Sequence, residues 1–183
     1  MFFKNRLKRF FVEDQSGVIL VELIVMLPAM LFAFYMGFAF FDAYQAKVAS
    51  ERAAYTLGDL ISRETGTVDS AYIDGMGEIF TYLTDADQDD YWFRVTSLTW
   101  SDEDEGHTID WSDATTNNSA MTQSELNSIL ESIPLMADGD TIMVVETNET
   151  YTPILSGMIG NQIFKNINIV RARFVPAVLY EDS

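Results

Sequence analysis

The sequence contains no cysteine, one histidine and few basic residues. The absence of cysteine excludes disulfides, thiolate zinc sites, CxxC redox motifs and cysteine nucleophiles. Lys and Arg total 11 against 28 Asp and Glu, so the formal net charge of the 183 residues is −17. Nucleic-acid binding needs clustered Lys and Arg to neutralise phosphates. The acidic balance therefore argues against a nucleic-acid partner.

The apolar residues, by contrast, are concentrated near the N-terminus. Residues 18–41 read VILVELIVMLPAMLFAFYMGFAFF, and Glu22 is the only charged residue among them. At about 1.5 Å per residue this segment would extend roughly 36 Å as a helix, against a hydrocarbon core of about 30 Å. Tilt can absorb the excess length. The segment is therefore predicted to be a single transmembrane helix.

The distribution of charge predicts how this helix is oriented. Residues 1–17 carry four basic and two acidic side chains, whereas residues 42–183 carry 7 basic and 25 acidic ones. The positive-inside rule then places the N-terminus in the cytoplasm and the acidic part across the membrane. We expect an inner-membrane protein with a periplasmic C-terminal domain.

Three interpretations of the N-terminus compete. A secretory signal peptide would have a shorter apolar core than 18–41, without Glu22, and only Gly37-Phe38-Ala39 offers a weak cleavage site. An uncleaved membrane anchor explains the length and the flanking charges, but it does not explain the placement of Gly17, Glu22 and Pro28. The third interpretation uses those residues.

At the junction, Gly17 precedes an apolar run that starts at Val18 and has Glu22 as its fifth member. This pattern resembles the cleavage site of type IV pilin-like precursors. Through residues 21–28, VELIVMLP, the sequence is more closely similar to the TadE-like proteins of the tight-adherence (Tad, or Flp) pilus system. Leu23 stands where phenylalanine is commoner in that family. The resemblance covers residues 15–41, and in the C-terminal part of the chain it is loose.

The resemblance implies both a fold and a function. The fold would be α+β and pilin-like, a lollipop in which a long N-terminal helix carries a small domain of antiparallel sheet and helices. The protein would be a minor pilin or pseudopilin, processed after Gly17 and acting in pilus assembly, adhesion or secretion. Its partners would be the prepilin peptidase, other pilin-like subunits and the inner-membrane assembly platform. In an assembled pilus the domain would be extracellular.

The position of Glu22 supports this interpretation on physical grounds. A carboxylate at the centre of a bilayer costs about 2.5 to 3.5 kcal/mol, and less near a membrane surface. Cleavage after Gly17 would free an amine at Val18, four residues earlier and on the same helical face. The amine and carboxylate could pair within one helix or between subunits. The alternative is a glutamate that snorkels to the headgroups.

Two further features of the apolar segment suggest contacts between helices. Pro28 cannot donate a hydrogen bond to the Ile24 carbonyl, so it should kink or loosen the helix, although a proline is also common in ordinary spans. Ala29, Ala33 and Gly37 recur at intervals of four and would form a strip where another helix could approach. Such strips also occur by chance.

The chain divides by composition into a basic leader (1–17), a transmembrane helix (18–41), a stalk helix (42–66) and an acidic α+β domain (67–183). In the acidic domain, the spacing of apolar residues predicts a helix over 68–84 with an apolar face. Thr122 and Glu125 form a capping box, which predicts a short helix that ends at about Ser132. Strands are predicted over 91–100, 141–151 and 167–175. Residues 153–166 are expected to connect the last two strands, and 102–118 to form an acidic loop. The apolar face of the helix predicted over 68–84 comprises Ile73, Met76, Ile79, Phe80 and Leu83.

Arg171 and Arg173 alternate onto one face of the last predicted strand. We expect them to form cross-strand ion pairs with Glu146 or Glu149 on the strand before it.

No catalytic, cofactor-binding or metal-binding residue is assigned. Asp85, Asp87 and Asp89 begin like a calcium loop, but Asp90 and Thr96 occupy its diagnostic glycine and glutamate positions. Calcium in an irregular acidic loop stays open, as does an acidic surface without a ligand. Asp110-Trp111-Ser112 hints at a metal-dependent adhesion site, but Ala114 replaces its second serine. His107 is expected on the surface.

Motifs for an enzyme are missing as well, since there is no P-loop, GxGxxG, GxSxG or HExxH. The protein is therefore expected not to be an enzyme. The rival interpretation is an uncleaved, single-pass anchored periplasmic binding module whose acidic domain captures a cation or a cationic ligand.

Overall fold

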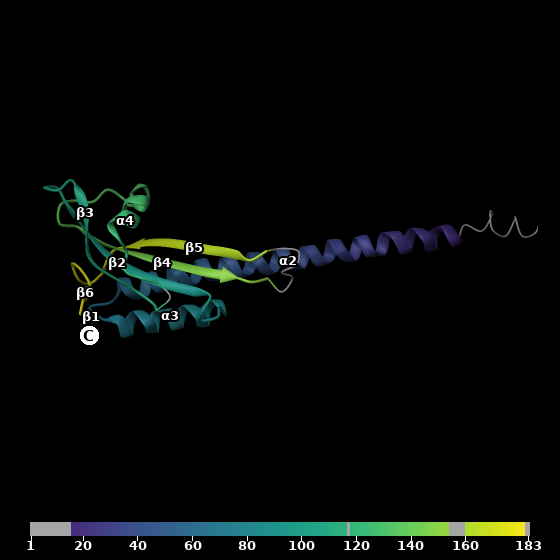
Figure 1. Ribbon diagram of the computed structural model, residues 1–183, viewed down its shortest axis with the longest axis horizontal. Coiled ribbons are helices and arrows are strands. Elements are labelled where there is room, and N and C mark those ends of the chain that lie inside the picture. Colours follow the sequence, from purple (N-terminus) through teal and green to yellow (C-terminus); the bar gives the residue numbers. More distant parts are fainter. Residues whose placement is uncertain (1–15, 117, 154–159, 182–183) are drawn as a thin grey trace, which may run out of the picture. The chain divides into compact units, whose positions relative to one another are not determined.

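The computed structural model describes residues 16–116, 118–153 and 160–181, and the side chains of these except for residues 16–20. The chain divides into two compact units, Met1–Asp42 and Ala43–Ser183. Residues 1–15 of the predicted leader and 154–159 of the predicted connection lie outside the described residues. The elements shown in Figure 1 are α2 (Ser16–Ser62), β1 (Thr67–Val68), α3 (Ser70–Thr84), β2 (Tyr91–Ser101), β3 (Gly106–Ala114), α4 (Gln123–Ile129), η1 (Leu130–Ser132), β4 (Thr141–Tyr151), β5 (Gln162–Val170) and β6 (Leu179–Tyr180).

The long predicted helix is confirmed as α2, which continues through Pro28 and ends at Ser62. Beyond its end, the Glu64 carboxylate accepts hydrogen bonds from the backbone N–H groups of Thr65 and Gly66, at 2.9 and 3.0 Å. The Gly66 and Thr65 hydrogen bonds hold the pKa of Glu64 below its ordinary value. This turn reverses the chain into β1. The boundaries predicted at residues 17 and 66 stay predictions.

The second unit is built on a four-stranded sheet in the order β3-β2-β4-β5, with every neighbouring pair antiparallel. The central strands β2 and β4 begin at the predicted residues Tyr91 and Thr141. A separate pair of short parallel strands, β1 and β6, was not anticipated from the sequence. The coarse prediction of an antiparallel sheet with helices is confirmed.

Within this unit, part of α2 and all of α3 cover one face of the sheet (Figure 1), and α4 lies on the other. The alternation of side chains along β2 and β4 sends successive residues to opposite faces and so creates two cores. The core under α2 and α3 includes Ala53, Leu57, Ile61, Val68, Ile73, Met76, Phe80, Tyr91, Phe93, Val95, Met143, Val145 and Val178. The core under α4 consists of Leu98, Met121, Leu126, Ile142 and Val144.

A bulge in β3 allows that strand to contribute side chains to both cores. Ser97 of β2 pairs with Trp111, but the next residue, Leu98, pairs with Ile109, so Asp110 is the extra residue. Trp111 and Ile109 are two positions apart and would share a face in a regular strand. Because of the bulge, Trp111 packs against the α2 and α3 side and Ile109 against the α4 side.

Two secondary-structure predictions were wrong, and one predicted apolar face is only partly buried. Residues 106–114 form β3 rather than part of an acidic loop, because they pair with β2 along its length. The last long strand is β5 at 162–170 rather than 167–175, so part of the predicted connection belongs to the sheet. In the predicted face of α3, Ile79 and Leu83 are 41% exposed, whereas Ile73, Met76 and Phe80 are buried.

Both shorter helices begin where a side chain caps them. The Asp69 carboxylate accepts a hydrogen bond from the backbone N–H of Tyr72 at 2.8 Å and starts α3. At α4 the predicted capping box is confirmed, since Thr122 accepts from the Glu125 N–H and Glu125 accepts from the Thr122 N–H. Each cap satisfies backbone donors that the first turn of a helix leaves unpaired.

Candidate functional site

The apolar half of α2 is exposed around most of its circumference, and only Met36 and Ala39 among residues 21–41 are half-buried or buried. Between Val21 and Phe41 every large apolar side chain apart from Met36 is between 47% and 72% exposed. These residues are nearly consecutive, so they point in all directions around the helix axis rather than along one stripe. A helix that is apolar all round belongs in a membrane or among other helices. By length and composition, α2 could span a membrane.

The predicted processing residues lie at the start of this helix. Gly17 and Val18 are in the first turn of α2, and Glu22 follows one turn after Val18. The Glu22 side chain is exposed, and it has no ion-pair partner among the residues whose side chains the structure describes. The i, i+4 spacing places Val18 and Glu22 on one face. Cleavage after Gly17 and pairing of the new amine with Glu22 stay predictions.

The predicted packing residues share one face of the same segment. Ala29, Ala33 and Gly37 are all exposed, and a Cβ added at Gly37 would meet no atom within 4 Å. This strip is therefore open to a close approach by another helix. The helix passes through Pro28 without a break. A role for Pro28 or the strip in assembly stays a prediction.

In the second unit, α2 is held close to β5 by a glycine. A Cβ added at Gly58 would overlap the Asn168 amide nitrogen and lie 3.2 Å from Val170 Cγ1. A larger residue at this position would therefore require the Asn168 side chain to move. Nearby, the Asn166 amide donates to the hydroxyls of Ser50 on α2 and Thr147 on β4, each at 3.0 Å. The helix and the two strands are thereby joined by partly buried hydrogen bonds.

Glu149 adds a buried carboxylate to this interface. It is 4% exposed, and its Oε2 atom has no hydrogen-bond partner among the described residues. Burial raises the pKa of Glu149 above the ordinary glutamate value, although a hydrogen bond with Ser50 opposes the shift. Burial disfavours the charged form because the protein interior solvates an ion less well than water. Glu149 is therefore a site where protonation and stability are linked.

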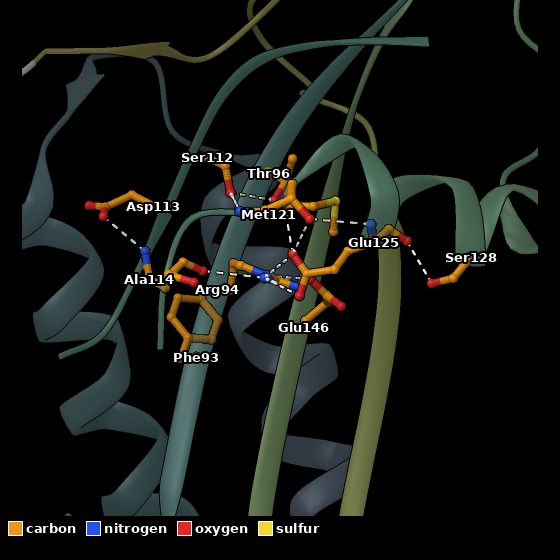
Figure 2. A network of polar contacts seen from close by, with 12 residues as sticks. Phe93, Arg94, Thr96, Ser112, Asp113, Ala114, Met121, Glu125, Ser128 and Glu146 are labelled. Carbon is orange, nitrogen blue, oxygen red and sulfur yellow. Dashed lines mark hydrogen bonds and ion pairs between the residues drawn. The ribbon is translucent and has the colours of Figure 1, made fainter. Parts of the chain in front are cut away.

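The opposite face of the sheet contains a second charged group, centred on Arg94 (Figure 2). The Arg94 Nε atom donates to Glu146 Oε2 at 2.7 Å, and Nη1 lies 3.3 Å from Glu125 Oε1. Nη1 also donates to the Ser119 carbonyl at 3.2 Å. The side chains of Arg94 and Glu146 are 4% and 9% exposed. This network joins β2 and β4 to the first turn of α4.

The energetics of this pair favour the ionised form of arginine. Burial lowers the pKa of Arg94, but the hydrogen bond and charge of Glu146 outweigh this effect and leave the pKa above its ordinary value. Glu125 contributes in the same direction, and Arg94 also lies over the Trp92 ring at 5.5 Å from its centroid. Because the buried guanidinium of Arg94 stays charged, the fold requires its acidic partners Glu146 and Glu125.

Arg171 and Arg173 do not make the predicted contacts with Glu146 or Glu149. They follow β5 instead of alternating within it, because the strand ends at Val170. Arg171 pairs with Asp140 and Arg173 with Asp59, both at 2.8 Å. The error in the strand boundary therefore led to the wrong partners.

The acidic segments form no cation site that the structure describes. Among the described residues, no three His, Asp or Glu side chains gather closely enough to hold a metal ion. Asp85 instead ends α3 as a left-handed cap, donating its N–H to the Thr81 carbonyl at 2.8 Å. Asp110 accepts hydrogen bonds from the hydroxyls of Ser97 and Thr99. Calcium binding in an irregular acidic loop stays a hypothesis.

His107 lies on β3 and is half-buried, rather than in a surface loop. Its ring packs edge-on against Trp100 with 4.7 Å between centroids, and its Nε2 atom has no hydrogen-bond partner among the described residues. Burial lowers the pKa of His107. It therefore contributes packing to the hairpin of β2 and β3.

Sequence reasoning missed the buried pair of Arg94 and Glu146, and it missed the burial of Glu149 on the other face of the sheet. One signal was present, because an arginine in the otherwise apolar run YWFRVTSL is unusual for a central strand. Its partner could not be named without the register in which Arg94 lies opposite Glu146.

No family model, curated protein or solved structure matches this chain. The geometry of α2 and of the second unit is therefore the basis for the functional argument.

Proposed function

We propose that the protein is a TadE-like minor pilin or pseudopilin of a Tad/Flp-type pilus system, anchored in the inner membrane by α2 with its C-terminal domain in the periplasm. The prepilin peptidase cleaves it after Gly17, and the mature helix packs against other pilin-like subunits on the assembly platform. The domain then acts in pilus assembly, adhesion or secretion. The protein is a substrate of processing and not an enzyme.

One observation carries the proposal: residues 21–35 expose apolar side chains on all sides, and Glu22 is the only charge among residues 21–41. Lipid explains the apolar surface by itself. It does not explain a carboxylate one turn beyond a glycine at a basic-to-apolar junction, because the ion is unfavourable in hydrocarbon. Cleavage at Gly17 supplies the cation that makes the carboxylate favourable.

The two halves of α2 have different surroundings, as a membrane-anchored subunit requires. Residues 21–41 make an apolar surface available to lipid or neighbouring helices, whereas Ala53, Leu57 and Ile61 are buried in the core of the second unit. A single helix thus provides both a membrane segment and part of the core of a folded domain. That combination suits a subunit whose exported domain must be carried by its own anchor.

N-terminal sequencing of the membrane-purified protein, with and without an active prepilin peptidase, tests the proposal. A start at Val18 only when the peptidase is active supports it, and Gly17→Ala should then prevent cleavage while Ser16→Ala, its matched neighbour, should not. An intact leader in cells with active peptidase would overturn the proposal and favour the uncleaved anchored binding module. In the native host, Glu22→Ala should reduce surface pili, and Glu22→Asp should restore part of the loss.

A further inference from the structure

Three of the few basic side chains in the second unit gather near the end of α2. Arg63 and Arg173 bind opposite oxygens of Asp59, with Nη2 to Oδ2 at 2.7 Å and Nη2 to Oδ1 at 2.8 Å. Arg171 lies on the same segment as Arg173 and pairs with Asp140. The backbone N–H of Arg173 also donates to the Ser62 carbonyl at 2.8 Å, which fixes this segment against α2.

Arg171 and Arg173 border a cavity of about 290 Å³, which we call the arginine cavity. Its volume is at the lower end of the range for ligand pockets, so it fits one or two side chains better than a large molecule. The cavity lies where α2 and β5 meet the segment that follows β5. Its lining residues are Tyr55, Asp59, Ser62, Asn168, Val170, Arg171 and Arg173.

The lining has an excess of positive charge. It contains two arginines and one aspartate, and the Asp59 charge is shared with Arg63, which pairs with it as well. Each guanidinium carries five N–H donors, and the structure assigns one ion pair to each of Arg171 and Arg173. Their side chains are 55% and 56% exposed. The remaining donors are available to an anion with the planar shape of a carboxylate.

The same unit also exposes a matching acidic feature. Residues Asp102, Glu103, Asp104 and Glu105, which we call the acidic tip, form the turn between β2 and β3, and all four are exposed. Asp102 accepts a hydrogen bond from Trp100 Nε1 at 2.6 Å, and its N–H donates to Asp138. The carboxylates of the other three have no hydrogen bond or ion pair among the described residues. They project from a hairpin that the sheet holds in place.

We propose that the arginine cavity binds the acidic tip of a second copy of the chain. Within one copy the arginines pair with Asp59 and Asp140 and not with the tip. A separate copy brings the carboxylates of Glu103 and Asp104 to the free guanidinium donors. Two copies with a net charge of −17 each repel one another overall, so their association requires a local match of this kind. The contact does not depend on cleavage after Gly17.

Two charge-reversal variants of the full chain, compared and mixed in detergent micelles, test this contact. One variant reverses the cavity with Arg171→Glu and Arg173→Glu, and the other reverses the tip with Glu103→Lys and Asp104→Lys. Each variant alone should associate at least about tenfold more weakly than wild type by analytical ultracentrifugation, because charge-assisted hydrogen bonds are lost. An equimolar mixture should recover association, since the reversed cavity then meets the reversed tip.

Two controls separate this contact from unfolding and from a general charge effect. Arg52→Glu with Lys165→Glu makes the same charge change as the cavity variant at exposed sites and should leave association unchanged. Asp87→Lys with Asp89→Lys, at two exposed positions, is the matched control for the tip. Recovery in the mixture also excludes misfolding, because an unfolded variant would not be rescued by a second variant.

A disulfide experiment tests the geometry directly, since the chain has no cysteine of its own. Oxidising a mixture of Val170→Cys and Glu103→Cys copies should yield a mixed disulfide, and replacing the second variant with Asp85→Cys should not. Association of both charge variants at wild-type strength, or no recovery in the mixture, would overturn the proposal. Weaker association of the cavity variant, with the tip variant still associating as strongly as wild type, would also overturn it, because the cavity would then bind a carboxylate other than the tip.

Discussion

The buried pair of Arg94 and Glu146 offers the sharpest test of how the second unit is held together. Arg94→Met keeps much of the side-chain volume but leaves the Glu146 carboxylate, which is 9% exposed, without its cation. Removing one partner of a buried ion pair costs about 3 to 5 kcal/mol, because the other charge stays buried and unpaired. The same change removes the bond from Arg94 to Glu125 in the first turn of α4.

Such a loss is a large part of the stability of a domain, which is about 5 to 15 kcal/mol in total. Thermal unfolding followed by circular dichroism in detergent should show a midpoint lower by on the order of 10 °C. The matched control is Arg52→Met, since Arg52 is an exposed arginine on α2. It should shift the midpoint by no more than about 2 °C, because most surface substitutions change stability by within about 0.5 kcal/mol.

A double-mutant cycle distinguishes this reasoning from a simple loss of packing. Arg94→Met together with Glu146→Leu removes both charges and should be clearly more stable than Arg94→Met alone, because an apolar pair can replace a buried ion pair. If Arg94→Met were no more harmful than Arg52→Met, the claim that Glu146 depends on its cation would be refuted. Strict additivity in the double mutant would refute it as well.

Three further substitutions test other contacts of the second unit. Glu149→Gln should stabilise the protein near neutral pH and flatten its pH profile in urea unfolding, because burial raises the pKa of Glu149 above 4.5. The folded state of the wild type binds this proton more tightly than the unfolded state, so its stability should fall as the pH rises from about 4.5 through the folded pKa and level off above it. An unchanged profile in Glu149→Gln would contradict this. Thr122→Ala should cost about 0.5 to 2 kcal/mol by removing the cap of α4, and Thr116→Ala, at an exposed position outside a helix, should cost less in the same assay. Phe80→Ala should cost about 3 to 5 kcal/mol in urea unfolding, because Phe80 is 0% exposed, and a loss as small as that of Tyr82→Ala, which removes an 87% exposed side chain, would show that α3 is not part of the core.

Predictions from local sequence patterns succeeded where one property dominated a segment. The strand at 141–151 has the predicted bounds because a turn at Asp138-Gly139 precedes a run that begins TIMVV and is rich in β-branched residues. The cap of α4 was also predictable, since Thr122 and Glu125 satisfy each other's backbone groups over three residues. Both features depend only on residues that are close in sequence.

Predictions failed where pairing with a distant segment decided the outcome. β3 contains the polar residues of GHTIDWSDA, and its strand character comes from pairing with β2 and from the bulge at Asp110. The alternation of Arg171 and Arg173 suggested a strand, but the backbone leaves the sheet after Val170 and bonds to Ser62 of α2. No local pattern contains that contact, because Ser62 and Arg173 are far apart in sequence.

The sequence by itself determined that the chain has one long apolar helix and an acidic α+β remainder, because a run of apolar residues and a charge imbalance are properties of composition and order alone. It also placed Glu22 one helical turn after Val18, because helix geometry fixes that spacing. Only the tertiary structure decided that Arg94 lies opposite Glu146, that Gly58 lets α2 approach β5, and that the arginines near the end of α2 border a cavity. The reason is physical: strand register and helix packing are set by the whole core at once, and they bring together residues that no local interaction joins.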